Sequence, residues 1–131
     1  MTSPTNSVII INDNIDLLNL FKDALQHQGF ETYTFTDPSL ALKKIKADPV
    51  EFSLVIINYS SQLKNRLKGS GKFAKEVKAI NKNIKVMLTS GFNFSAVDIS
   101  REGYDKFLQL PVKLSTLVSM VKEILNREAT F

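Results

Sequence analysis

The fold of this 131-residue chain is decided by residues 8–14, Val-Ile-Ile-Ile-Asn-Asp-Asn. The four β-branched residues that begin this stretch predict a short strand, and because all four are apolar the strand is expected to be buried on both faces. From residue 13 onward apolar side chains recur every three or four residues, which predicts an amphipathic helix that ends at Gly29. A buried strand followed directly by such a helix is the repeating unit of a parallel α/β sheet.

The same alternation continues along the rest of the chain. Further strands are predicted at residues 30–35, 52–57, 84–88 and 104–110, and further helices at residues 38–47, 72–80, 94–101 and 114–126. The buried face of the second helix is expected to carry Leu40, Ala41, Leu42 and Ile45. Five strands that alternate strictly with five helices predict an α/β fold, in which a doubly wound parallel sheet carries helices on both faces.

Composition excludes several classes of protein. The chain has no Cys, so it has neither disulfides nor a thiolate nucleophile, and one histidine, His27, cannot make a histidine metal site or a serine-type triad. No apolar run approaches the roughly 18 residues that span a bilayer, and residues 1–7 lack the basic start of a secretory signal. We therefore expect a cytoplasmic protein without membrane contact, folded as a single domain over residues 1–131 with tails at residues 1–6 and 128–131.

The net charge of +4 is unevenly distributed along the chain. Residues 64–85 contain eight basic residues and one acid, Glu76, and so carry +7, which leaves −3 for the remainder. The basic residues are Lys64, Arg66, Lys68, Lys72, Lys75, Lys78, Lys82 and Lys85. Two interpretations are open: a solvated loop and helix face, or a docking surface for an acidic partner or a nucleic-acid backbone.

Residues at the ends of the predicted strands form the candidate site, because ligands of open α/β sheets bind beyond the carboxyl ends of the strands. They are Asn12 and Asp13 after the first strand, Asn58 after the third, Thr89 and Ser90 after the fourth, and Leu110 and Pro111 after the fifth. Purely structural roles are also open. Asn12 and Asp13 suit the cap of the first helix, and Thr89 suits a turn.

These residues, taken in order, resemble the receiver domains of response regulators, the CheY-like family. The resemblance rests on Ile-Ile-Asn-Asp-Asn at 10–14, Leu-Val-Ile-Ile-Asn at 54–58, Met-Leu-Thr-Ser at 87–90, Gly-Tyr-Asp-Lys-Phe-Leu at 103–108 and Phe-Leu-Gln-Leu-Pro at 107–111. It covers residues 7–127 and implies a flavodoxin-like (βα)5 sheet with the strand order 2-1-3-4-5.

The resemblance also implies a role for each position. In the family, an acidic pair after the first strand holds Mg²⁺, and an Asp at the end of the third strand accepts a phosphoryl group from a histidine kinase. A Thr or Ser after the fourth strand, and a Lys before a Pro after the fifth, contact that group. Asp13 and Thr89 match the pattern, as does the proline at residue 111, whose peptide bond is often cis in the family. Asn12, Asn58 and Leu110 depart from it at the first acid, the acceptor and the Lys.

The three departures imply a receiver that no longer accepts a phosphoryl group by the family's mechanism. The amide of Asn58 has no ionised oxygen that could attack phosphorus. An amide at residue 12 leaves Asp13 as the one carboxylate for Mg²⁺ at the matching positions. Without the acids a Lys at residue 110 would be an unpaired charge, which explains Leu110. Departures that fit together favour a natural loss over a single engineered substitution. We expect no catalytic residue, no enzyme activity and no cofactor.

The resemblance thus implies a pseudo-receiver: an atypical receiver of two-component-type phosphorelay signalling that works through protein contact. A histidine kinase or a downstream effector is the expected partner. Phe107 stands where receivers carry an aromatic switch residue, so the face around the fourth helix, the fifth strand and the last helix is the expected partner surface. Core packing is the other role open to Phe107. The alternative function is a binding module that uses residues 64–85. A flavodoxin-like enzyme is not expected, because no Gly-rich phosphate loop is present.

Overall fold

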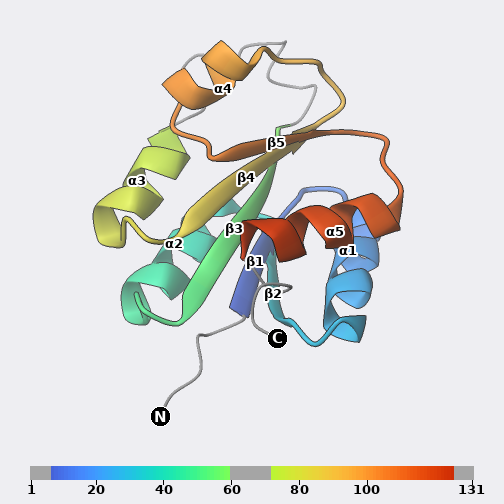
Figure 1. Cartoon of the computed structure of the whole chain (residues 1–131). Helices are drawn as coiled ribbons and strands as arrows, with labels where there is room; N and C mark the ends of the chain where they lie inside the picture. Colours follow the sequence, from blue (N-terminus) through green and yellow to red (C-terminus); the bar gives the residue numbers. More distant parts are fainter. Residues whose placement is uncertain (1–6, 60–71, 126–131) are drawn as a thin grey trace.

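Within the described residues, five strands and five helices alternate, as the sequence pattern predicts (Figure 1). The computed structural model describes residues 7–59 and 72–125. The elements are β1 (Ser7–Ile11), α1 (Ile15–His27), β2 (Glu31–Phe35), α2 (Pro38–Ala47), β3 (Phe52–Tyr59), α3 (Lys72–Ile80), β4 (Lys85–Ser90), α4 (Ala96–Arg101), β5 (Lys106–Gln109) and α5 (Leu114–Ile124). The strands form a parallel sheet in the order β2-β1-β3-β4-β5, which confirms the predicted fold.

Helices cover both faces of the sheet (Figure 1). Val8 and Ile10 of β1 belong to the core that α1 and α5 cover, whereas Ile9 and Ile11 belong to the core beneath α2, α3 and α4. Successive side chains of a strand point to opposite faces, so a strand with helices on both sides buries every side chain. This double cover explains the unbroken apolar run in β1. Among the helices of the described residues, none has the length and apolar character needed to cross a membrane.

Several element boundaries differ from the predicted ones. β3 continues to Tyr59 and β4 to Ser90, so Asn58 and Thr89 lie within paired strands rather than beyond them. β5 ends at Gln109, one residue earlier than predicted, in a segment where Pro111 has no N–H to donate to a ladder. The peptide bond before Pro111 is cis, as the resemblance implies.

The boundaries of the last two helices also differ. α4 begins two residues later than predicted, because Ser95 caps it: the Ser95 hydroxyl oxygen accepts a hydrogen bond from the N–H of Asp98 at 3.1 Å. α5 ends at Ile124. The predicted end at residue 126 and the predicted tails at residues 1–6 and 128–131 lie outside the described residues.

The prediction that Leu40 lies on the buried face of α2 is wrong. Its side chain is 49% exposed, whereas Ala41 and Ile45 are fully buried and Leu42 packs against the core. An α-helix turns by about 100° per residue. A face centred on Ala41 and Ile45 therefore includes Leu42 more readily than Leu40, which lies further round the helix.

A tyrosine on the edge strand β2 is held by two carboxylates. The hydroxyl oxygen of Tyr33 lies 2.8 Å from an oxygen of Glu51 and 3.2 Å from an oxygen of Glu31. Its ring packs edge-on against Phe52, and the ammonium group of Lys44 lies 5.1 Å from the ring centre. The hydrogen bond to Glu51, with burial and the charge of Glu31, raises the pKa of Tyr33 to about 12.

We expect Tyr33→Phe to remove the tyrosine ionisation that has its midpoint near pH 12. Because the pKa in the folded protein lies above the ordinary 10.0, the stability from the protonated hydroxyl is present below pH 10 and is lost as the pH rises through about 12. An alkaline titration of tyrosinate absorbance measures this. Tyr104→Phe is the matched control, and it should keep the ionisation near pH 12. If that ionisation persisted in the Tyr33→Phe variant, it would not belong to Tyr33.

Candidate functional site

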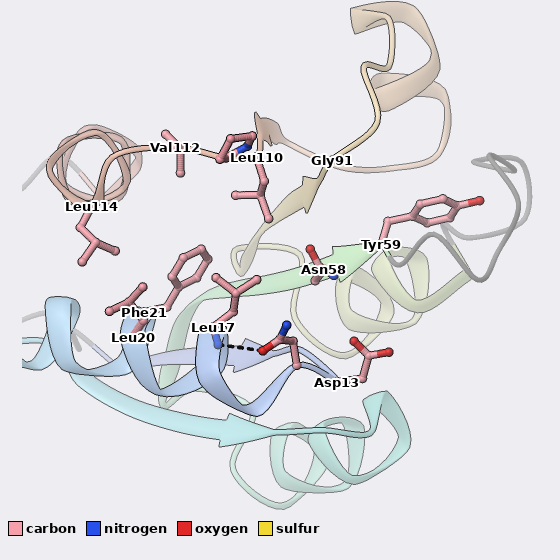
Figure 2. A pocket seen from close by; sticks show the side chains of 12 residues that line it. Asp13, Leu17, Leu20, Phe21, Asn58, Tyr59, Gly91, Leu110, Val112 and Leu114 are labelled. Atoms are coloured by element: carbon pink, nitrogen blue, oxygen red, sulfur yellow. Dashed lines mark hydrogen bonds between the residues drawn. The ribbon is translucent and has the colours of Figure 1, made fainter.

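Two asparagines build the turn from β1 into α1. Asn12 is buried, and its Oδ1 accepts a hydrogen bond from the backbone N–H of Asn14 at 2.9 Å. Asn14 is the N-cap of α1, because its Oδ1 accepts from the N–H of Leu17 at 3.1 Å (Figure 2). The cap is therefore Asn14 and neither Asn12 nor Asp13, and the side chain of Asn12 shapes the preceding turn.

Asp13 is exposed at the carboxyl edge of the sheet. Its carboxylate forms no hydrogen bond or ion pair with any of the described residues. In Figure 2 the side chain lies at the same end of the site as Asn58 and far from Leu114. Asp13 therefore brings to this edge a negative charge that no other described residue offsets.

A hydrogen bond joins β3 to β4 at the centre of the site. Asn58 and Thr89 are partners in the strand register, and the Thr89 hydroxyl donates to Oδ1 of Asn58 at 3.0 Å. Thr89 is only 1% exposed. One position further on, the Ser90 hydroxyl donates to the backbone carbonyl of Tyr59 at 3.1 Å and accepts from the N–H of Phe92. Both hydroxyls are thus bonded within the protein.

The residues present do not fit the Mg²⁺ ion of the receiver family. Mg²⁺ is held in proteins chiefly by carboxylates and phosphate. Here Asp13 is the one carboxylate at the matching positions, and the amide oxygens of Asn12 and Asn58 already accept hydrogen bonds from Asn14 and Thr89. The described parts of the chain hold no group of three or more His, Cys, Asp or Glu side chains arranged to bind a metal.

An apolar cavity lies beside these polar groups, between α1 and the segment that follows β5 (Figure 2). Its volume is about 520 Å³. The described residues that line it are Asp13, Asn14, Leu17, Leu20, Phe21, Asn58, Tyr59, Gly91, Leu110, Pro111, Val112 and Leu114. Leu110 points toward Asn58 in Figure 2, so an alkyl side chain faces the amide of Asn58.

Phe107 belongs to a chain of aromatic rings above the ends of β3, β4 and β5. Its ring lies 5.7 Å from that of Phe94, which in turn lies 5.4 Å from Tyr59 and 6.0 Å from Phe92, measured between ring centres. Packing of this kind supports the structural role that was open to Phe107. Sequence reasoning missed the other three rings. The Phe92-Asn-Phe94 spacing could have indicated an aromatic cluster. It does not show which other rings would pack against these two.

In the described part of the basic segment, one of the five lysines forms an ion pair. Lys72 and Lys75 are exposed on α3, and Lys82 and Lys85 are exposed beyond it. The ammonium of Lys78, however, lies 2.6 Å from Oδ2 of Asp105, and the same oxygen accepts a hydrogen bond from the N–H of Val86. Lys78 therefore ties α3 to the sheet. Lys64, Arg66 and Lys68 lie outside the described residues.

Comparison by sequence yields no relative: no protein-family model matches the chain, and no curated protein does. Comparison by structure gives many matches. A response regulator from Thermotoga maritima superposes with a TM-score of 0.79 at 17% identity, over 93% of this chain and 98% of that one. A CheY-like receiver domain protein from Methanospirillum hungatei JF-1 gives 0.78 at 19% identity, over 95% and 97%.

A response regulator receiver domain protein from Clostridium thermocellum gives a TM-score of 0.77 at 22% identity, over 94% of this chain and 96% of that one. The three matches extend over nearly the whole length of both chains. At these identities the likeness establishes the fold, which is that of response-regulator receiver domains.

Proposed function

We propose that the chain is a pseudo-receiver, a module of two-component-type signalling that works by protein contact and accepts no phosphoryl group. The observation that carries this proposal is the hydrogen bond from Thr89 to Asn58. It is made by an amide at the position that resembles a receiver's acceptor carboxylate, and this supports the proposal. An amide has no ionised oxygen with which to attack phosphorus, and its oxygen is already bonded to the hydroxyl that would contact the phosphoryl group.

The surroundings of Asn58 support the same proposal. Phosphoryl transfer needs cations that offset the charge on the equatorial oxygens. The alkyl group of Leu110 faces Asn58 in Figure 2, so this position supplies no such cation. The single carboxylate of Asp13 is a poor magnesium site. The chain is therefore proposed to act without metal or cofactor and not as an enzyme.

A signalling protein, either a histidine kinase or a downstream effector, is the proposed partner, and the face of α4 and β5 is its proposed contact surface. A hollow of about 540 Å³ lies there, lined by Phe94, Ala96, Ile99, Ser100, Tyr104, Asp105, Lys106 and Phe107. Val97, on α4, is 65% exposed. Aromatic side chains at the centre of a surface, with charged residues at its rim, are typical of protein interfaces.

We expect no phosphoryl adduct when the protein is incubated with acetyl phosphate and Mg²⁺. Intact-mass spectrometry measures this as the absence of a species heavier by about 80 Da. A response regulator with an intact acceptor Asp, treated in parallel, is the positive control. A stoichiometric adduct on this chain that disappears on treatment with hydroxylamine, as an acyl phosphate does, would contradict the proposal.

The alternative, a binding module built on residues 64–85, has less support from the described residues. Lys78 is paired with Asp105, and the exposed cations of the described part of this segment are Lys72 and Lys75 on α3 and Lys82 and Lys85 after it. Exposed lysines spaced along a helix and the turn that follows it are typical of an ordinary solvated surface. The pseudo-receiver is therefore the better supported function.

A further inference from the structure

We propose that the cavity between α1 and the segment after β5 binds a small organic cation, an amine with an apolar body. The proposal concerns a site separate from the α4–β5 partner face, and it does not depend on whether the chain takes up phosphate. It rests on three features of the cavity: its size, its apolar walls and a negative charge at one end that has no partner among the described residues.

The cavity has the size and walls of a small-molecule site. A volume of about 520 Å³ lies within the range of roughly 300–1,000 Å³ that is usual for ligand pockets. Leu17 and Phe21 of α1 face Val112 and Leu114 across it, so an occupant would be held from two sides (Figure 2). Leu20 is 47% exposed at this site, and a bound apolar group would remove part of its side chain from water.

The polar end of the cavity favours a cation. Among the described residues that line it, Asp13 carries the one formal charge, and that carboxylate has no partner within the described residues. Leu110 adds no competing positive charge. The start of α1 contributes only about half a unit of positive charge. Asp13, together with Asp16 in the first turn of α1, outweighs it.

The apolar and polar residues of the cavity lie at opposite ends, an arrangement that suits an amphipathic molecule. In Figure 2, Leu20, Phe21 and Leu114 cluster at one end, while Asn58 and Asp13 lie at the other. An aromatic or alkyl body would pack on the leucines and the phenylalanine, and its ammonium group would reach the carboxylate of Asp13. A neutral analogue would keep the apolar contact and lose the charge, and an anionic analogue would be repelled.

Three probes that differ mainly in the head group test this: phenylpropylamine, phenylpropanol and phenylpropionate. Each is titrated into the isotope-labelled protein, and backbone amide chemical shifts are followed by NMR. We expect saturable shifts at Leu17, Leu20, Phe21 and Val112, with the amine binding about three- to fivefold more tightly than the alcohol, as a partly exposed ion pair provides. The carboxylate should bind most weakly. Shifts centred on α4 and β5 instead, or no saturable shifts with any probe, would overturn the proposal.

Two variants and one control separate the charge from the fold. Asp13→Asn should lower the affinity for the amine to that for the alcohol, and it should leave the affinity for the alcohol unchanged. Leu110→Lys adds a positive charge that offsets Asp13, so it should remove the preference for the amine over the alcohol. Asp23→Asn removes an exposed carboxylate of α1 that does not line the cavity, so it should change neither affinity. Equal affinity for the amine in the Asp13 variant and the unmodified chain would overturn the proposal. Because no phosphodonor enters this experiment, that result would leave the proposed function unaffected.

Discussion

A chain with the three substitutions Asn12→Asp, Asn58→Asp and Leu110→Lys is expected to take up one phosphoryl group from acetyl phosphate, where the unmodified chain takes up none. The change at residue 58 supplies an ionised oxygen, which Thr89 can reach from its present position at 3.0 Å. The change at residue 12 places a second carboxylate beside Asp13 for Mg²⁺. The change at residue 110 supplies a cation where Leu110 now faces Asn58.

Intact mass over time, with Mg²⁺ present, measures the adduct of about 80 Da. Asn58→Asp alone should react at least about 100-fold more slowly than the triple variant, because it lacks the metal carboxylate and the cation that stabilise the transition state. The matched control combines Asn12→Asp with Leu110→Lys and keeps the amide of Asn58; it should remain unmodified. An adduct on that control, or a folded triple variant that stays unmodified, would show that residue 58 is not the acceptor position.

Leu54→Ala is expected to lower the free energy of unfolding by about 2–5 kcal/mol. Leu54 lies in the central strand β3, is 0% exposed, and packs with the core that α1 and α5 cover. The loss is large beside the total of about 5–15 kcal/mol that holds a domain of this kind together.

Leu40→Ala is the matched control, since the same atoms are removed from a side chain that is 49% exposed. Its effect should stay within about 0.5 kcal/mol. Urea unfolding followed by circular dichroism measures both values. Equal losses for the two variants would contradict the burial of Leu54 relative to Leu40.

The fold could be predicted from the sequence because the pattern of its strands is unusually direct. β1 and β3 each contain an unbroken apolar run, at residues 8–11 and 54–57, and amphipathic helices separate the strands. The parallel sheet with helices on both faces could therefore be predicted from the sequence alone. Leu40 was misplaced because apolar residues at 40, 41 and 42 leave the centre of a helical face undefined until the neighbouring core is known.

The residues at the carboxyl edge were also predicted, but their bonds were not. Strand register decides that Thr89 meets Asn58, and periodicity does not reveal register between strands 31 residues apart. Asn14 is the N-cap of α1 because of the local turn geometry. The sequence could not identify it, because Asn and Asp, which both favour this position, occupy residues 12–14. The pairing of Lys78 with Asp105 joins segments 27 residues apart, which a composition of basic residues cannot show.

The hydrogen bond between Thr89 and Asn58 bears on how long this module could retain a signal. A phosphoryl group, once attached, is a covalent record that persists until it is hydrolysed. A hydrogen bond breaks and re-forms with the fluctuations of the strands and stores nothing. If contact with a partner is the whole of its activity, the fraction of the protein engaged follows the concentrations of the two molecules at each moment. The module would then report how much of a partner is present now, without memory of an earlier stimulus.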